Sequence, residues 1–218
     1  MIFIISPGRC GSTLMMQLMS QTLRIQSLDD KRGNSIHIEE HGYISNMKTR
    51  LTHDIIHVHL NDRRFLSIRS ETVPSDLIYY VLRKNLVEYI ASHYIAKEIN
   101  KYHWKRDDVI PDISYERKKL NKNDVVGIMS AMKIYYNEYI KHRRQENYKH
   151  VHLVYYEDFV KTFSSPEFTF HPESMEAVKT EKTLIKSKID KKRYLDYDHL
   201  TDIVLQYNNG SIYFNPSN

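Results

Sequence analysis

Short apolar runs alternate with amphipathic stretches along this chain. Four runs that are continuously apolar or alternate with β-branched residues predict strands at Ile2–Ile5, Asp54–Leu60, Leu77–Leu82 and Val151–Tyr155. Helical spacing of apolar residues predicts helices from Gly11 or Ser12, over Leu86–Ile99, from Asn123 or Asp124 to Glu146, from Tyr156, and over Asp198–Gln206. This order predicts an α/β fold with a mainly parallel central sheet and helices on both faces.

The remaining stretches are polar or irregular. Gln26–Gly42 is polar and mixed, and Asp29–Asn34 within it is predicted to be a surface loop. Tyr102–Lys122 is predicted to be a loop or lid, and Ser164–Lys182 to be irregular. A chain of 218 residues has the size of one α/β domain, so the sequence predicts a single domain over residues 1–218.

Charge and cysteine content narrow the class of protein. The net charge of +5 suits an anionic ligand, but the basic residues are scattered among 27 acidic ones, so nucleic acid is not expected as a partner. The single cysteine, Cys10, excludes an internal disulfide framework and a metal site made of cysteines. The sequence has neither a signal-peptide pattern nor an apolar stretch of about 18 residues, which predicts a cytoplasmic protein without a membrane span.

The loop between the first strand and the first helix has the chemistry of an anion site. Backbone N–H groups at the start of a helix point the same way, and the helix dipole attracts negative charge. Arg9 adds a positive charge, and Ser12 and Thr13 add hydroxyls, so the loop suits a phosphate or a similar group. A plain helix cap at Ser12 with a solvated Arg9 is the simpler alternative. Gly11 stands where a Walker A loop needs Lys, which argues against a nucleotide kinase or NTPase.

A second basic turn repeats this arrangement. The strand at Leu77–Leu82 runs directly into Arg83-Lys84-Asn85 and the next predicted helix. Two adjacent anion sites at one edge of a sheet indicate a ligand with two separated phosphate groups.

Candidate acid–base residues lie in two places. The alternating strand Asp54–Leu60 places His57 and His59 on the same face, and because no third ligand is evident nearby, satisfied or catalytic imidazoles are favoured over a metal site. Glu39 and Glu40 lie in the polar stretch after the first helix, which in this architecture comes near the carboxyl ends of the strands. Taken singly, each carboxylate is better explained by a solvated acidic patch.

Three stretches in chain order, together with a fourth, resemble the P-loop sulfotransferases that use 3′-phosphoadenosine-5′-phosphosulfate (PAPS). Pro7–Leu14 resembles the 5′-phosphosulfate loop of that family, and Val81–Tyr94 resembles its 3′-phosphate motif. His57–Leu60 is similar to the family's Lys-Thr-His-Leu segment, and Leu153–Phe159 is similar to a later strand end.

The resemblance implies roles for individual residues. The residues implied for PAPS binding are Pro7, Gly8, Arg9, Cys10, Gly11, Ser12, Thr13, Leu14, Arg83, Lys84, Ser92 and Tyr156. Lys186, Ser187 and Lys188 are candidates to replace an Arg-Lys-Gly element that this sequence lacks, or form a solvated basic run. Either Arg83 or Lys84 binds the 3′-phosphate, and the usual spacing to Ser92 fits Lys84 better. Arg9 and His59 are the implied catalytic residues, with Glu39 or Glu40 as the rival base.

The implied reaction is transfer of a sulfuryl group from PAPS to a hydroxyl, or as a second choice an amine, leaving adenosine 3′,5′-bisphosphate (PAP) as product. No metal is expected. The acceptor is a small molecule, a glycan or a peptide, and the sequence specifies neither which one nor the oligomeric state. A P-loop kinase or NTPase, and a non-catalytic protein that binds a nucleotide or a sulfated glycan, are the alternatives.

Overall fold

A computed structural model describes residues 1–22, 35–39, 55–59, 72–99, 117–163 and 189–215 of the chain. The expected single domain is not confirmed, because the chain divides into two compact units. The first unit combines Met1–Leu82 with Ile134–Val178, and the second combines Arg83–Lys133 with Lys179–Asn218.

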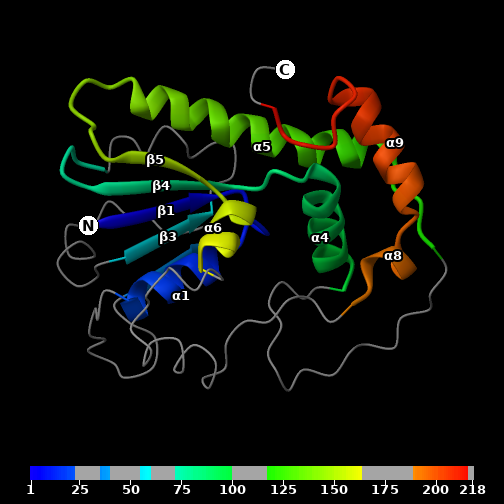
Figure 1. Cartoon of the computed structure of the whole chain (residues 1–218), viewed down its shortest axis with the longest axis horizontal. Helices are drawn as coiled ribbons and strands as arrows, with labels where there is room; N and C mark the ends of the chain where they lie inside the picture. Colours follow the sequence, from blue (N-terminus) through cyan, green and yellow to red (C-terminus); the bar gives the residue numbers. More distant parts are fainter. Residues whose placement is uncertain (23–34, 40–54, 60–71, 100–116, 164–188, 216–218) are drawn as a thin grey trace. The chain divides into compact units, whose positions relative to one another are not determined.

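The first unit is built on a parallel five-stranded sheet (Figure 1). Its strands are β1 (Ile2–Ser6), β2 (Ser35–Glu39), β3 (Ile55–His59), β4 (Leu77–Leu82) and β5 (Val151–Tyr155). They are arranged in the order β2-β3-β1-β4-β5, and every neighbouring pair is parallel. The predicted α/β class and the mainly parallel sheet are therefore confirmed.

Four of the five strands agree with the sequence prediction to within a few residues, and β2 was missed. Ser35-Ile-His-Ile-Glu39 does alternate polar and apolar residues, as a strand does. The alternation covers only five residues inside a stretch that is otherwise polar, so no strand was predicted within Gln26–Gly42. Its partner β3 supplies the hydrogen bonds that hold this short strand.

β1 lies at the centre of the sheet, between β3 and β4. Phe3, Ile4 and Ile5 are completely buried, as expected of a strand covered by packing on both faces. Because all five strands are parallel, their carboxyl ends lie at the same edge. Helix α1 (Ser12–Thr22) begins six residues after the end of β1, and α6 (Tyr156–Phe163) follows β5 directly. Loops that could bind a ligand are thus gathered at this edge.

Helix α5 (Lys122–Arg143) belongs to both units, with the boundary after Lys133. In the first unit its last turn buries His142 completely against β4. The two ring nitrogens of His142 lie 3.2 Å from the hydroxyls of Tyr80 and Thr72, so the buried imidazole is satisfied on both sides.

The described part of the second unit contains the helices α4 (Leu86–Glu98), the first half of α5, α8 (Lys191–Tyr194) and α9 (Tyr197–Tyr207). Its core contains Tyr89, Ile90, Val125, Tyr194, Leu200 and Val204. No helix in the described parts of the chain is both long and apolar enough to span a bilayer.

The segment Ser211–Asn215, here named the C-terminal strap, pairs with the turn that precedes α4. The carbonyl of Ile212 accepts from Leu86 N at 2.9 Å, and the N–H of Phe214 donates to the carbonyl of Lys84 at 2.7 Å. Asn208 is buried and donates to the carbonyls of Ser211 and Tyr213. The turn that carries the second basic motif is therefore fixed from the far end of the sequence.

Candidate functional site

The loop between β1 and α1, Pro7–Gly11, has an unusual backbone. Gly8 and Gly11 have φ of 75°, and Arg9 has φ of 54°, in the left-handed region. For a residue with a side chain this conformation costs roughly 1–2 kcal/mol. Successive residues of mixed handedness turn their N–H groups toward one concave side, which is the geometry of an anion-binding nest. The strained Arg9 suggests that its position matters more than local stability.

Gly11 is required for a second reason, which is the close approach of Tyr156. A Cβ atom at Gly11 would overlap the ring of Tyr156, the first residue of α6. The carbonyl of Gly11 accepts the first hydrogen bond of α1, from Met15 N at 3.0 Å. The sequence singled out both residues, and the structure shows that Tyr156 contacts the loop itself.

Ser12, expected to hold a phosphate, is buried beside a second serine. Ser6 Oγ donates to Ser12 Oγ at 2.7 Å, and both residues are almost inaccessible. Ser6 was missed by the sequence analysis, although its position at the end of β1 is a signal for it. Cys10 is also completely buried, whereas Pro7, Gly8, Arg9, Thr13 and Leu14 are half-buried.

The rival bases lie at one register position of the sheet edge. His59, the last residue of β3, is the register partner of Ser6 in β1 and of Glu39 in β2. The backbone therefore brings His59 and Glu39 next to each other. His59 lies one strand and Glu39 two strands away from β1, the strand that leads into the loop. Glu40 lies outside the described residues.

In the second unit, side chains from three helices and one turn form a cluster, here named the Arg83 cluster. Its members are Arg83, Glu88, Ser92, Lys191 and Tyr197. Arg83 Nη1 donates to Ser92 Oγ at 3.1 Å, and Lys191 Nζ donates to the same oxygen at 2.7 Å. Two cations thus converge on one hydroxyl that is itself buried.

The geometry distinguishes Arg83 from Lys84. Arg83 is the residue that reaches Ser92, although the family spacing favoured Lys84. Lys84 is held through its carbonyl by the C-terminal strap. Asn85, the next residue, caps α4 by accepting from Glu88 N at 3.0 Å, which fixes where the helix begins relative to Arg83.

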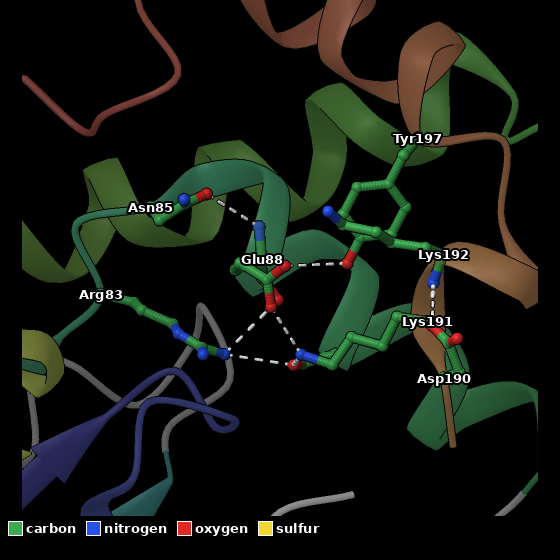
Figure 2. A network of polar contacts seen from close by, with 8 residues as sticks. Arg83, Asn85, Glu88, Asp190, Lys191, Lys192 and Tyr197 are labelled. Atoms are coloured by element: carbon green, nitrogen blue, oxygen red, sulfur yellow. Dashed lines mark hydrogen bonds and ion pairs between the residues drawn. The ribbon is translucent and has the colours of Figure 1, made fainter.

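Glu88 connects the two sides of the cluster (Figure 2). Lys191 Nζ donates to Glu88 Oε2 at 2.8 Å, and the hydroxyl of Tyr197 donates to Oε1 at 3.0 Å. Partial burial raises the pKa of Glu88, but the hydrogen bond and charge of Lys191, with smaller effects of Tyr197 and Arg83, outweigh it and leave this pKa below its usual value. Burial and the adjacent Glu88 carboxylate raise the pKa of Tyr197, so its hydroxyl stays protonated and donates.

Lys191 was not among the predicted site residues. Lys186, Ser187 and Lys188, which were, lie outside the described residues. Lys191 belongs to the same basic run, and the signal for it is Asp190, whose side chain accepts from Lys192 N at 3.1 Å and caps the short helix α8. Such a cap fixes the direction of the first helical residue, here Lys191.

Comparison with protein families, curated proteins and solved structures finds no match to this chain. Among the described residues, no group of three or more His, Cys, Asp and Glu side chains is placed to hold a metal ion.

Proposed function

We propose that this protein transfers a sulfuryl group from PAPS to a hydroxyl or amine of an acceptor and releases PAP. The observation that supports the proposal best is the convergence of Arg83 and Lys191 on Ser92 directly after a strand of the parallel sheet. PAPS differs from the substrates of nucleotide kinases by its 3′-phosphate, and two cations with a hydroxyl suit this group.

The loop Pro7–Gly11 is proposed for the 5′ end of the cofactor. During transfer the acceptor oxygen bonds to sulfur, the bond from sulfur to the bridging oxygen breaks, and its electron pair stays on the leaving 5′-phosphate. Fixed N–H groups and Arg9 lower this barrier because they oppose the growing negative charge without having to move. The left-handed backbone of Gly8 and Arg9 supports this role.

A base must take the proton of the acceptor. A neutral imidazole at His59 is suited to this near pH 7, and the carboxylate of Glu39 is the rival at the same register position. Tyr156 packs on Gly11 and is proposed to hold the loop in its bound shape.

The decisive experiment compares calorimetric binding of PAP and of adenosine 5′-phosphate. Wild type is expected to prefer PAP, and Arg83→Ala is expected to lose about ten- to a hundredfold in PAP affinity, because one charge-assisted contact contributes about 1.5–3 kcal/mol. Equal binding of the two nucleotides by wild type would refute the 3′-phosphate assignment.

Transfer itself is tested with PAPS labelled on sulfur and pools of acceptors. Label is expected to appear on a hydroxyl-bearing acceptor and to disappear in Arg9→Ala, with a loss of roughly 10²–10³-fold as for other preorganised donors. Binding of PAP without any transfer of label would identify a non-catalytic nucleotide-binding protein instead.

A further inference from the structure

Glu88 is the unexpected member of the Arg83 cluster, because a carboxylate repels a phosphate. It lies at the third position of α4 after the cap Asn85, where a glutamate commonly turns back toward the cap. Here its carboxylate instead accepts from Lys191 and Tyr197, residues more than a hundred positions away in the chain. The side chain is thus placed by tertiary contacts with the cluster rather than by the helix start.

The charges of the cluster explain why a carboxylate is present. Arg83 and Lys191 both donate hydrogen bonds to the same oxygen, Ser92 Oγ. Two positive charges this close repel each other when no anion is bound. Glu88 is partly buried and pairs with Lys191, and this opposite charge offsets the repulsion. Figure 2 shows Arg83 and Lys191 approaching Glu88 from different sides. Arg83 Nη1 donates to the backbone carbonyl of Glu88 at 3.4 Å, whereas Lys191 and the hydroxyl of Tyr197 donate to its carboxylate.

We infer that Glu88 is a built-in counterion that competes with the anion bound by Arg83 and Lys191. It keeps both cations in place in the empty site and weakens the binding of a phosphate there. This inference rests on the proposed function: Glu88 limits the affinity for the 3′-phosphate and so favours release of PAP. Lys191 divides its hydrogen bonds between Glu88 and Ser92, which makes it the cation that gains most when Glu88 loses its charge.

Glu88→Gln tests this inference with little change in shape. The amide oxygen can still accept from Lys191, and the amide nitrogen can donate to the hydroxyl of Tyr197, which is able to accept as well as donate. Asp202→Asn is the matched control, because it makes the same change of net charge on an exposed face of α9.

Binding of PAP and of adenosine 5′-phosphate is measured by calorimetry at low and at high ionic strength. Glu88→Gln is expected to bind PAP about tenfold more tightly than wild type at low ionic strength, because a like charge beside the phosphate is gone. Adenosine 5′-phosphate should bind unchanged, and Asp202→Asn should behave as wild type with both nucleotides. Unchanged or weaker PAP binding by Glu88→Gln overturns the inference and would make Glu88 a support for Lys191.

Two further measurements distinguish a failure of the proposed function from a failure of the inference about Glu88. If wild type fails to prefer PAP, the proposed function fails, and inorganic sulfate then serves as the probe for the cluster. Tighter sulfate binding by Glu88→Gln that disappears in Glu88→Gln/Lys191→Ala supports the competing role of Glu88 without the nucleotide, whereas no gain overturns it. Should Glu88→Gln fail to fold in a thermal melt, Glu88→Ala removes the same charge and is expected to change affinity in the same direction.

Discussion

The loop Pro7–Gly11 and the Arg83 cluster are both suited to anions, but they are built in opposite ways. The loop depends on the backbone, with three left-handed residues and a helix start within a few positions. The cluster depends on side chains, and its central contact joins Ser92 to Lys191, 99 residues later. A backbone site is sensitive to any added side chain, whereas a side-chain site is sensitive to the loss of particular charges.

The largest effect is expected at the sheet edge beside the loop, where the proposed base lies. His59→Ala should reduce kcat by roughly 10²–10⁴-fold, the usual contribution of a positioned acid or base, while PAP binds as in wild type. The measurement is single-turnover transfer of labelled sulfuryl groups at several pH values.

Glu39→Gln is the companion variant, because Glu39 and His59 are register partners. If His59→Ala keeps wild-type turnover and Glu39→Gln loses it, the base is the carboxylate. If both variants lose turnover and also bind PAP more weakly, the sheet edge is disturbed and the loss does not identify a missing base.

Gly11→Ala tests the dependence of the loop on its backbone. The alanine would have to adopt φ near 75° and overlap the ring of Tyr156, so the free energy of unfolding should fall by about 2–4 kcal/mol. Chemical denaturation measures this change.

Gly127→Ala is the matched control, since no atom lies within 4 Å of the added Cβ and the residue is inside α5. It should raise the free energy of unfolding by up to about 1 kcal/mol. Equal effects of the two alanines would show that Gly11 is not specially constrained.

The two sites differ in how far the sequence predicted them. The strand at Ile2–Ile5, the loop after it and the start of the helix at Gly11 or Ser12 were predicted because all the determinants are local: an apolar run, glycines and a helical repeat. The division into two units was not predicted. The edge strand β2 was not predicted either, because it is stabilised by pairing with β3 rather than by its own short pattern.

Side-chain partners across the fold were the least predictable part. The sequence left Arg83 and Lys84 as alternatives. The structure shows that Arg83 reaches Ser92, with α4 capped by Asn85 two residues after Arg83. Lys191 could not be distinguished from its basic neighbours, because its role depends on packing of α8 near α4. The role of Glu88 could not be predicted from the sequence, because glutamate is common in the first turn of a helix.

Lys191→Ala tests the dependence of the cluster on a particular side chain. PAP affinity should fall about ten- to a hundredfold, because a charge-assisted contact of about 1.5–3 kcal/mol is lost, while binding of adenosine 5′-phosphate is unchanged. Lys192→Ala is the control, since Lys192 is the next residue and exposed. Similar losses of PAP affinity in both variants would indicate a diffuse effect of positive charge and would show that the Arg83 cluster is not a specific binding site.

The smallest effect is expected from the C-terminal strap, whose backbone hydrogen bonds hold the turn beside Arg83. Asn208→Ala removes the amide that donates to the carbonyls of Ser211 and Tyr213, at 2.6 and 2.8 Å. The strap should then loosen from Lys84 and Leu86, lowering the free energy of unfolding by about 1–2 kcal/mol and weakening PAP binding a few-fold through the displaced Arg83. Asn209→Gly, at an exposed residue with φ of 50°, keeps these hydrogen bonds and suits the left-handed backbone, so both quantities should stay near wild type. If Asn208→Ala destabilises the protein but leaves PAP affinity unchanged, the strap supports the fold alone and Arg83 is positioned by the cap at Asn85.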